Sequence, residues 1–184
     1  NGYSFVAAEF NYESGPVLAH NISFGVQDKI NALNIKTISF WAYVSDIGYL
    51  VSNYNAGSTG VKSGWAVYIN GGFLFYQEEY GGLWTTSTSI SDNTWAHCVI
   101  TKDSTGIDIA PNIYIDGVST SVTTSTSQTA LRSEIGNSLS IGGAQNESQP
   151  YATFLGKLKD VRIYDRILTA AEVLALEAEG VGGD

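Results

Sequence analysis

Cysteine, histidine, proline and methionine are scarce in this chain. Its 184 residues include one cysteine, two histidines, three prolines and no methionine. A single cysteine cannot form a disulfide within the chain, which excludes a scaffold held together by disulfides. Because Cys98 lies in the apolar run 95–100, we expect it to be a small buried hydrophobic residue.

Positive charge and long apolar runs are also scarce. Nine lysines and arginines against eighteen acidic residues give a net charge of −9 and a pI of about 4.5. Nucleic acids and anionic membranes attract clustered basic residues, and here these residues are scattered. No apolar run approaches the ~18 residues that span a bilayer. We therefore expect no nucleic-acid binding and no membrane insertion, whereas neutral glycans and divalent cations remain suitable ligands.

The composition is that of one folded domain. Hydrophobic residues make up 43% of the chain and charged residues 15%, which excludes a disordered protein. The length suits a single sandwich-sized domain over residues 1–184. Because the chain starts at Asn1 rather than at methionine, we expect it to be a piece excised from a larger protein.

Short segments with strand character follow one another along almost the whole chain. The pairs Asn70-Gly71 and Asp116-Gly117 predict tight hairpin turns between such segments. Many short strands punctuated by turns indicate an antiparallel two-sheet sandwich. The expected strands are 4–10, 37–44, 49–54, 64–70, 73–79, 83–90, 95–102, 113–115, 139–142 and 157–165. Residues 17–24 are either irregular or a second strand, and 118–127 are expected to be an exposed strand and loop.

The end of the chain predicts a strand and then one short helix. Residues 157–165 alternate between polar and apolar, and the alternation slips once near Asp160. Thr169 and Glu172 have the spacing of a capping box, so a helix is expected to begin there. We expect Val173, Leu174 and Leu176 to form a short apolar stripe that packs this helix on the sheet.

Six segments together resemble the laminin-G-like jelly-roll domains of the concanavalin A-like lectin/glucanase superfamily. The most specific is residues 154–172, F-x-G-x-L-x-D-V-R-I-Y-D-R-x-L-T-x-x-E. The resemblance covers nearly the whole chain and implies a jelly-roll sandwich with one C-terminal helix. The other five segments, in order, are AEFNYESG at 8–15, ISFGVQDKI at 22–30, TISFWAYVSD at 37–46, NTWAHCVITKD at 93–103 and NIYIDGVST at 112–120.

Catalysis is not expected from this sequence. Enzymes of this superfamily carry carboxylates at E-x-D-x-E spacing on one strand, which aims two of them into a cleft. The nearest candidates here, Glu78 and Glu79, are adjacent and would point to opposite faces of a strand. His97 matches a packing position beside Trp95, and His20 falls in a loop. We therefore predict no catalytic residues in this chain.

A sugar site needs exposed rings for stacking and amides or carboxylates for hydrogen bonds. Trp84 stands in a polar strand where the family carries no core aromatic, so we expect it to contact carbohydrate. Tyr76, Glu78 and Tyr80 share one strand face by alternation and are expected beside it. The alternative is an aromatic ladder that only stabilises the sheet. Trp41, Trp65 and Trp95 match core or rim positions of the family.

Two loops are candidates for the rim of the same site. One carries Asn53, Tyr54 and Asn55, and the other carries Gln145, Asn146 and Tyr151. Each combines amides with an aromatic ring, and binding residues favour loops on a rigid scaffold. The alternative is that both are ordinary solvated loops.

The resemblance also implies a structural Ca²⁺. Relatives hold it with an aspartate of the closing strand and with backbone carbonyls of the first two strands. The matching residues are Asp160 for the carboxylate and Glu9 or Asn11 and Gly25 for the carbonyls. Calcium prefers six to eight oxygen ligands of these kinds. The alternative is that Asp160 merely caps a bulge.

The sequence thus predicts a non-catalytic carbohydrate-binding module that recognises a poly- or oligosaccharide. We expect it to work outside the cell, on a cell surface or on a virion, with other domains of a parent protein as further partners. The second interpretation is a protein–protein or structural module of a virion or cell surface. The third is a glycoside hydrolase or lyase.

Overall fold

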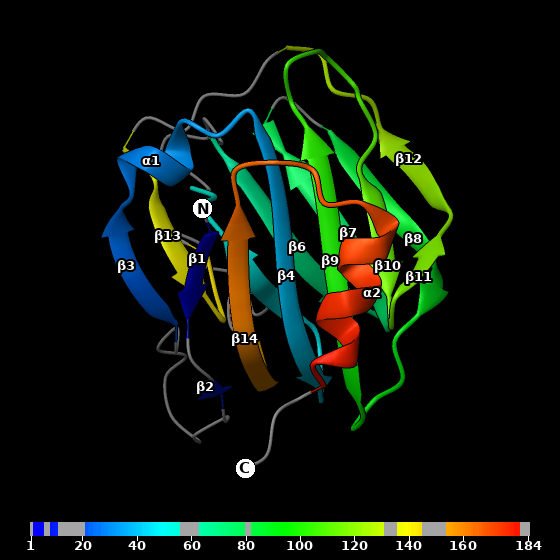
Figure 1. Ribbon diagram of the computed structural model, residues 1–184. Coiled ribbons are helices and arrows are strands. Elements are labelled where there is room, and N and C mark those ends of the chain that lie inside the picture. The colour runs from blue at the N-terminus through cyan, green and yellow to red at the C-terminus, as the bar shows by residue number, and fades with distance from the viewer. Residues whose placement is uncertain are drawn as a thin grey trace.

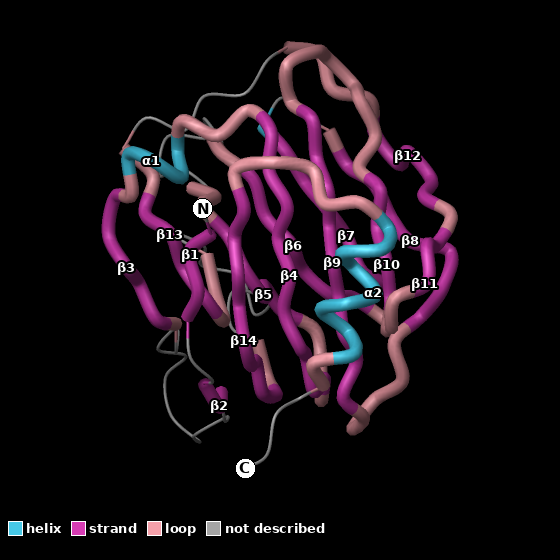
Figure 2. The backbone as a smooth tube through the Cα atoms, in the orientation of Figure 1, coloured by secondary structure: helices cyan, strands magenta, loops and turns pink. Residues whose placement is uncertain are grey.

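The chain folds into two antiparallel β-sheets that face each other (Figure 1). The computed structural model describes residues 21–55, 63–79, 82–130, 136–144 and 154–180, together with the backbone of 2–5 and 8–10. Two short helices accompany the strands within these ranges, as Figure 2 shows. This architecture confirms the predicted jelly-roll sandwich.

Sheet A lies in front in Figure 1, and the order of its main path is β1-β14-β4-β9-β10-β11, with β2 also paired to β14. Its long strands β4 and β9 are in continuous register, so that Phe40 faces Cys98 and Ile38 faces Ile100. The strands are β1 (Gly2–Phe5), β2 (Ala8–Phe10), β4 (Ile35–Val44), β9 (Trp95–Asp103), β10 (Asn112–Ile115), β11 (Val118–Thr120) and β14 (Gly156–Tyr164).

Sheet B lies behind sheet A, and its order is β12-β8-β7-β6-β5-β13-β3. The predicted hairpin of β6 and β7 is present, but its two turn residues are Gly71 and Gly72, with φ of 57° and 80°, because Asn70 still pairs with Phe73. The strands are β3 (Ile22–Val26), β5 (Gly48–Ser52), β6 (Trp65–Asn70), β7 (Phe73–Glu78), β8 (Leu83–Ser89), β12 (Val122–Thr126) and β13 (Ser138–Ile141).

The core lies between the two sheets because successive side chains on a strand point to opposite faces. Phe40, Cys98 and Ile100 of sheet A meet Val67 and Leu74 of sheet B in one buried cluster. Cys98 is fully buried, as predicted, and burial raises the pKa of its thiol far above the ordinary value. The thiol therefore acts as a small apolar side chain.

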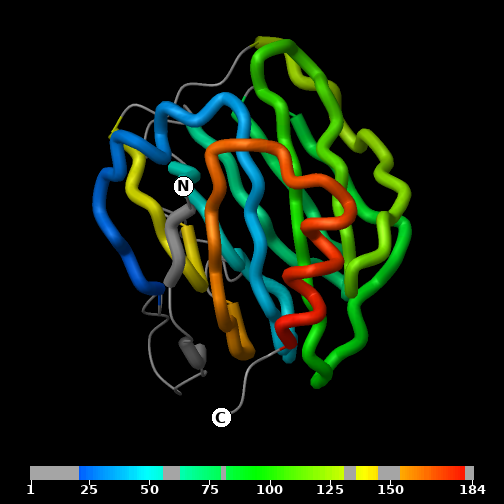
Figure 3. The backbone as a smooth tube through the Cα atoms, viewed as in Figure 1, coloured from blue at the N-terminus to red at the C-terminus, as the bar shows by residue number. Residues whose placement is uncertain are grey.

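The closing strand β14 joins the two ends of the chain in sheet A. It pairs with β4 on one side and with β1 and β2 on the other, and Figure 3 shows it (orange) beside β4 (blue). The predicted slip in its alternation is a β-bulge, because the register with β4 shifts between Lys159 and Arg162. Asp160 occupies the bulge with a φ of +53°.

The C-terminal helix α2 (Ala170–Ala178) covers part of the outer face of sheet A. The capping box is present, since Thr169 accepts from the N–H of Glu172 and the Glu172 carboxylate accepts from the N–H of Thr169. Arg166 donates two hydrogen bonds to the same carboxylate and lowers the pKa of Glu172 to about 2. The sequence did not predict the other helix, α1 (Asp28–Asn31), which is one turn long.

Helix α2 packs on the sheet through Val173, with Leu176 against the same cluster, but not through Leu174, the third member of the expected stripe. Val173 is fully buried against Leu168 and Val99, whereas the side chain of Leu174 is 55% exposed. A carboxylate at 173 would be buried without a partner, so Val173→Asp should lower the free energy of unfolding by about 3 kcal/mol. Urea denaturation checks this, and Leu174→Asp, the matched control, should change it by less than about 1 kcal/mol. Equal effects of the two substitutions would contradict this packing.

Candidate functional site

Three of the side chains predicted to bind carbohydrate lie inside the sandwich. Trp84 and Tyr76 are cross-strand partners in β8 and β7, and both are fully buried in the core with their rings 6.1 Å apart. Glu78 is buried on the same inner face. The prediction that these three side chains meet solvent is wrong, because alternation along β8 turns Trp84 toward the core, with Thr86 buried on the same face, while Thr85 and Ser87 lie on the other face.

Glu78 belongs to a buried polar cluster at one end of the core. Its carboxylate accepts from the hydroxyls of Tyr76 and Ser104 at 2.9 and 2.6 Å and lies 3.3 Å from Nζ of Lys102. The Lys102 ammonium sits 4.7 Å from the centroid of the Trp84 ring. Lys36, which is opposite Lys102 in β4, is also fully buried. We call Glu78, Lys102 and Lys36 the charged layer, and it is a structural feature that no ligand can reach directly.

The outer face of sheet B carries a row of partly exposed aromatic rings. Tyr49 of β5 is opposite Tyr68 of β6, and Tyr68 is opposite Phe75 of β7. The Tyr49 and Tyr68 centroids are 5.4 Å apart, and Tyr68 and Phe75 stack at 4.8 Å with their planes only 5° apart. All three side chains are half-buried. We call Tyr49, Tyr68 and Phe75 the aromatic row.

Hydrogen-bonding side chains continue this face beyond the aromatic row. Thr85 is opposite Phe75, and its hydroxyl lies 3.0 Å from that of Ser125 on β12. Gln77, two residues after Phe75, shares its face and is half-buried. Phe73 lies on the same side of β7 and is 39% exposed. The face thus presents rings, an amide and hydroxyls next to one another.

The electrostatic character of this face is close to neutral. None of the described strands of sheet B contains a lysine or an arginine, and the one acidic side chain among them, Glu78, points inward. Burial raises the pKa of the Tyr68 hydroxyl to about 12, so this group remains protonated and can donate a hydrogen bond. A ligand here would meet dipoles and rings rather than charges.

Of the predicted loop residues after β5, Tyr54 lies beside the aromatic row, whereas Asn53 has a structural role. Tyr54 is buried, and its ring stacks on Tyr49 at 6.2 Å, at one end of the aromatic row. Asn53 joins neighbouring segments, because its side-chain oxygen accepts a hydrogen bond from the N–H of Trp65 and its amide donates one to Asn31. Asn55 is half-buried. Tyr80, predicted on the strand face beside Trp84, lies outside the described residues, as do the predicted rim residues Gln145, Asn146 and Tyr151.

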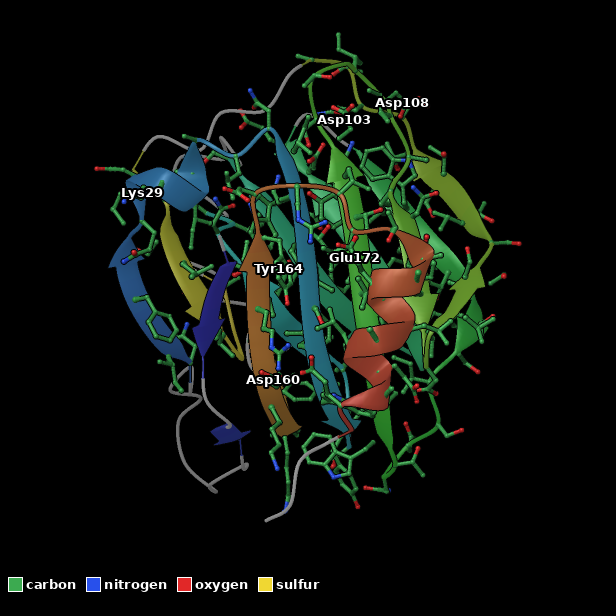
Figure 4. The ribbon with its side chains drawn as sticks, viewed as in Figure 1. Lys29, Asp103, Asp108, Asp160, Tyr164 and Glu172 are labelled. Carbon is green, nitrogen blue, oxygen red and sulfur yellow. The ribbon has the colours of Figure 1, made fainter. Side chains whose placement is uncertain are left out.

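The residues predicted to hold Ca²⁺ come from both sheets, and the one carboxylate whose side chain is described already has a partner. Both carboxylate oxygens of Asp160 are engaged by Arg162, at 2.8 Å from Nε and 2.6 Å from the terminal nitrogen. Gly25 lies in β3, which belongs to the other sheet, and the backbone of Glu9 is opposite Lys157 in the sheet A ladder. Figure 4 labels Asp160 on the front of β14. Asn11 lies outside the described residues.

The donor set is therefore a poor match for a calcium site. Arg162 also contacts Glu179 at 2.6 Å, so Asp160 joins an ion network that ties the end of α2 to β14. In the part of the chain that the structure describes, no three His, Cys, Asp or Glu side chains gather as metal ligands. Bound calcium would have to displace the guanidinium from Asp160, and a calcium site here stays a prediction.

His97 is buried on the outer side of sheet A and serves in packing, as predicted. Its Nε2 lies 3.0 Å from the hydroxyl of Ser39, and its ring lies 5.0 Å from that of Trp41. Burial lowers the pKa of His97 to about 4, although nearby Asp116 acts in the opposite direction. The imidazole is therefore neutral at neutral pH.

This shift predicts an acid-sensitive component of stability. The unfolded chain binds a proton at His97 near pH 6.5 and the folded chain only near pH 4. Protonation thus favours the unfolded state, and the free energy of unfolding should fall as the pH drops from 6.5 to 4. Urea denaturation across this range should give a shallower pH dependence for His97→Gln than for the wild type. Parallel curves would show that His97 does not titrate as described.

Comparison with known proteins agrees with this fold. The family described as "Concanavalin A-like lectin/glucanases superfamily", Laminin_G_3, matches residues 19–174. A rat protein named "Sushi, von Willebrand factor type A, EGF and pentraxin domain-containing protein 1" is 26% identical over 188 residues. That match covers 90% of this chain but only 5% of the rat protein. In the described residues, no helix is both long and apolar enough to cross a membrane.

Two solved structures illustrate the similarity. The CBM40 of the Ruminococcus gnavus IT-sialidase, bound to alpha2,3 sialyllactose, has a TM-score of 0.71 at 13% identity, covering 95% of this chain and 98% of that one. The heptameric SAP-like pentraxin from Limulus polyphemus has a TM-score of 0.67 at 16% identity, covering 94% and 81%. At these identities the likeness concerns the fold alone. With its family match over residues 19–174, the chain belongs to the laminin-G-type family of the concanavalin A-like lectin/glucanase superfamily.

Proposed function

We propose that the chain is a non-catalytic carbohydrate-binding module whose site is the outer face of sheet B. The observation that carries this proposal is the aromatic row, Tyr49, Tyr68 and Phe75, with Gln77 and Thr85 beside it. Sugar rings have apolar C–H faces and hydroxyl edges, so they suit a surface where aromatic rings adjoin amide and hydroxyl groups. The sialyllactose bound by the R. gnavus module of similar fold supports the same class of ligand.

The lack of basic side chains in the described strands of sheet B indicates which glycans this face would bind. A sialic acid or uronic acid would need a guanidinium or ammonium for its carboxylate. Because the described strands of sheet B contain neither lysine nor arginine, a neutral glycan is the better match. We propose that the module works outside the cell as one domain of a longer protein, as the small share of the rat relative that it covers suggests.

Phe75→Ala tests the proposal. Stacking of a sugar on an aromatic ring contributes about 1 kcal/mol or more, so the substitution should weaken binding at least about fivefold. A glycan array with the wild type would identify the oligosaccharide, and calorimetry would give the dissociation constants of both proteins. Ile107→Ala, an exposed apolar residue in the loop before β10, is the matched control and should bind like the wild type.

Two outcomes would oppose this proposal. Unchanged binding by Phe75→Ala would remove the aromatic row from the site. An array without any bound glycan, together with association of the wild type with a protein partner that Phe75→Ala abolishes, would favour the protein–protein interpretation. Thermal melting of each variant must accompany the binding data, because Phe75 also stacks on Tyr68.

A further inference from the structure

The outer face of sheet A carries two aromatic rings and a lysine side by side on three neighbouring strands. Tyr43 of β4 is the cross-strand partner of Lys157 in β14 and of Trp95 in β9. In each strand the next residue along belongs to the core, so these three side chains face outward. We call Lys157, Tyr43 and Trp95 the sheet A row.

The three side chains of the sheet A row contact one another. The rings of Tyr43 and Trp95 meet edge to face with their centroids 5.7 Å apart. The Lys157 ammonium lies 6.0 Å from the centroid of the Tyr43 ring. Rings that are already held by a neighbour lose little conformational entropy when a ligand binds. The row therefore presents a preformed pair of rings next to a positive charge.

Helix α2 leaves this row accessible although it covers other parts of the same face (Figure 1). Val173 of α2 packs on Val99 of β9. In the next row along β9, Trp41 and His97 are only 7% and 2% exposed. In the sheet A row, by contrast, both rings are half-buried and the lysine is exposed. Along β9, the sheet A row is thus the part of this face that a ligand can reach.

Two lysines place positive charge on this side of β14. Lys157 and Lys159 alternate with the buried Leu158, so both face outward. An ammonium binds a carboxylate through charge-assisted hydrogen bonds. The described strands of sheet B contain no lysine or arginine. The sheet A row therefore suits an acidic ligand, which the aromatic row on sheet B does not.

Three carboxylates around this face already have partners. Asp160 and Glu179 each contact a terminal nitrogen of Arg162 at 2.6 Å, and Asp116 accepts from the N–H of His97 at 2.8 Å. The chain as a whole has a net charge of −9, which repels polyanions over long distances. A ligand with a single carboxylate is therefore a better match for this row than a polyanion.

We propose that the sheet A row binds one acidic sugar residue, a uronic or a sialic acid. The apolar C–H face of the sugar stacks on the Trp95 indole, and its carboxylate pairs with the ammonium of Lys157. This inference goes beyond the proposed function, because the two sites lie on opposite faces of the sandwich and select sugars of different charge.

A heteronuclear NMR titration of the whole chain tests the row directly. The probes are methyl glucuronide and the methyl glycoside of N-acetylneuraminic acid, with methyl glucoside as the neutral counterpart of the first. At least one acidic glycoside should give saturable shifts of the Trp95 indole N–H and the Lys157 amide, and its binding should weaken as the ionic strength rises. Absence of these shifts with both acidic glycosides, or equal binding of methyl glucoside, would overturn the proposal.

Lys157→Met isolates the contribution of the charge, because methionine keeps the apolar part of the side chain. It should weaken binding of the acidic glycoside about fivefold, whereas Lys157→Arg should retain binding. Lys29→Met, which removes an exposed lysine from α1, is the matched control and should bind like the wild type. Wild-type binding by Lys157→Met would refute the contact with the carboxylate and the proposal with it.

Trp95→Leu tests the stacking. Leucine keeps apolar bulk beside Tyr43 but removes the indole, so binding of the acidic glycoside should fall at least about fivefold. Thermal melting must accompany this variant, because Trp95 also contacts Tyr43. A variant that melts and binds like the wild type would show that the indole does not stack on the sugar, contrary to the proposal.

The sheet A row and the aromatic row can fail separately. If Phe75→Ala weakens binding of a neutral oligosaccharide and Lys157→Met leaves binding of the acidic glycoside unchanged, the sheet A row is refuted and the proposed function stands. If Lys157→Met weakens binding of the acidic glycoside and Phe75→Ala leaves binding of the oligosaccharide unchanged, the sheet A row stands and the site proposed on sheet B is refuted.

Discussion

Trp84→Ala is expected to lower the free energy of unfolding by about 3–5 kcal/mol, the usual cost of removing a large buried side chain. The Trp84 ring is fully buried, contacts Tyr76 and lies under the ammonium of Lys102. Removing it leaves a cavity and takes the cation–π partner from a buried charge. Urea denaturation of the variant and the wild type gives the difference.

The matched control is Phe75→Ala, which removes a half-buried ring from the opposite face of sheet B. It should destabilise the protein less than Trp84→Ala and weaken glycan binding more. The opposite pattern, with normal stability and lost glycan binding in Trp84→Ala, would mean that Trp84 lies on the surface after all and that the aromatic row does not bind the ligand.

Lys102→Met is expected to lower the free energy of unfolding by about 3–5 kcal/mol because it leaves a buried carboxylate without its counter-charge. The Lys102 ammonium and the Glu78 carboxylate are both fully buried and 3.3 Å apart. Lys102 also donates to the carbonyls of Asp103 and Ile109, which ties the end of β9 to the loop that follows it. Denaturation at pH 7 measures the loss.

One control substitution and one double substitution test whether the loss in Lys102→Met comes from the buried ion pair. Lys29→Met, at an exposed position in α1, should change the free energy of unfolding by less than about 0.5 kcal/mol. Adding Glu78→Gln to Lys102→Met removes the orphaned charge and should restore part of the lost stability. A loss below about 1 kcal/mol for Lys102→Met alone would contradict a buried pair at this place.

Most of the fold could be predicted from the sequence because its signals are local. The Asn70-Gly71 turn, the capping box at Thr169 and the slip in alternation near Asp160 each involve only a few neighbouring residues. The structure has the helix start and the β-bulge at these positions, and the hairpin turns one residue later, at Gly71-Gly72. Each signal acts through backbone geometry, which does not depend on distant parts of the chain.

The site was harder to predict because it depends on which face of a strand is outside. Leu74 and Tyr76 of β7 face the core, whereas the alternate residues Phe75 and Gln77 face outward. Both faces carry an aromatic ring, so composition could not separate them. The alternation of Val67 and Ile69 with Tyr68 in β6 is the signal that could have identified the outer row.

The charged layer could not have been predicted from the sequence at all. Lys36, Lys102 and Glu78 are far apart along the chain, and lysine and glutamate are normally expected on the surface. Lys102 and Glu78 meet only because β9 and the facing sheet pack together, and β4 places Lys36 in the layer opposite Lys102. Such a cluster exists only once the sandwich has closed.

The most direct test of a glycan-binding outer face is an NMR titration of the isolated chain with the oligosaccharide selected on an array. The largest shifts should fall on the aromatic row and on its neighbours Gln77 and Thr85. Shifts confined to the other side of the molecule, at β14 and α2, or no shifts with any glycan, would contradict it.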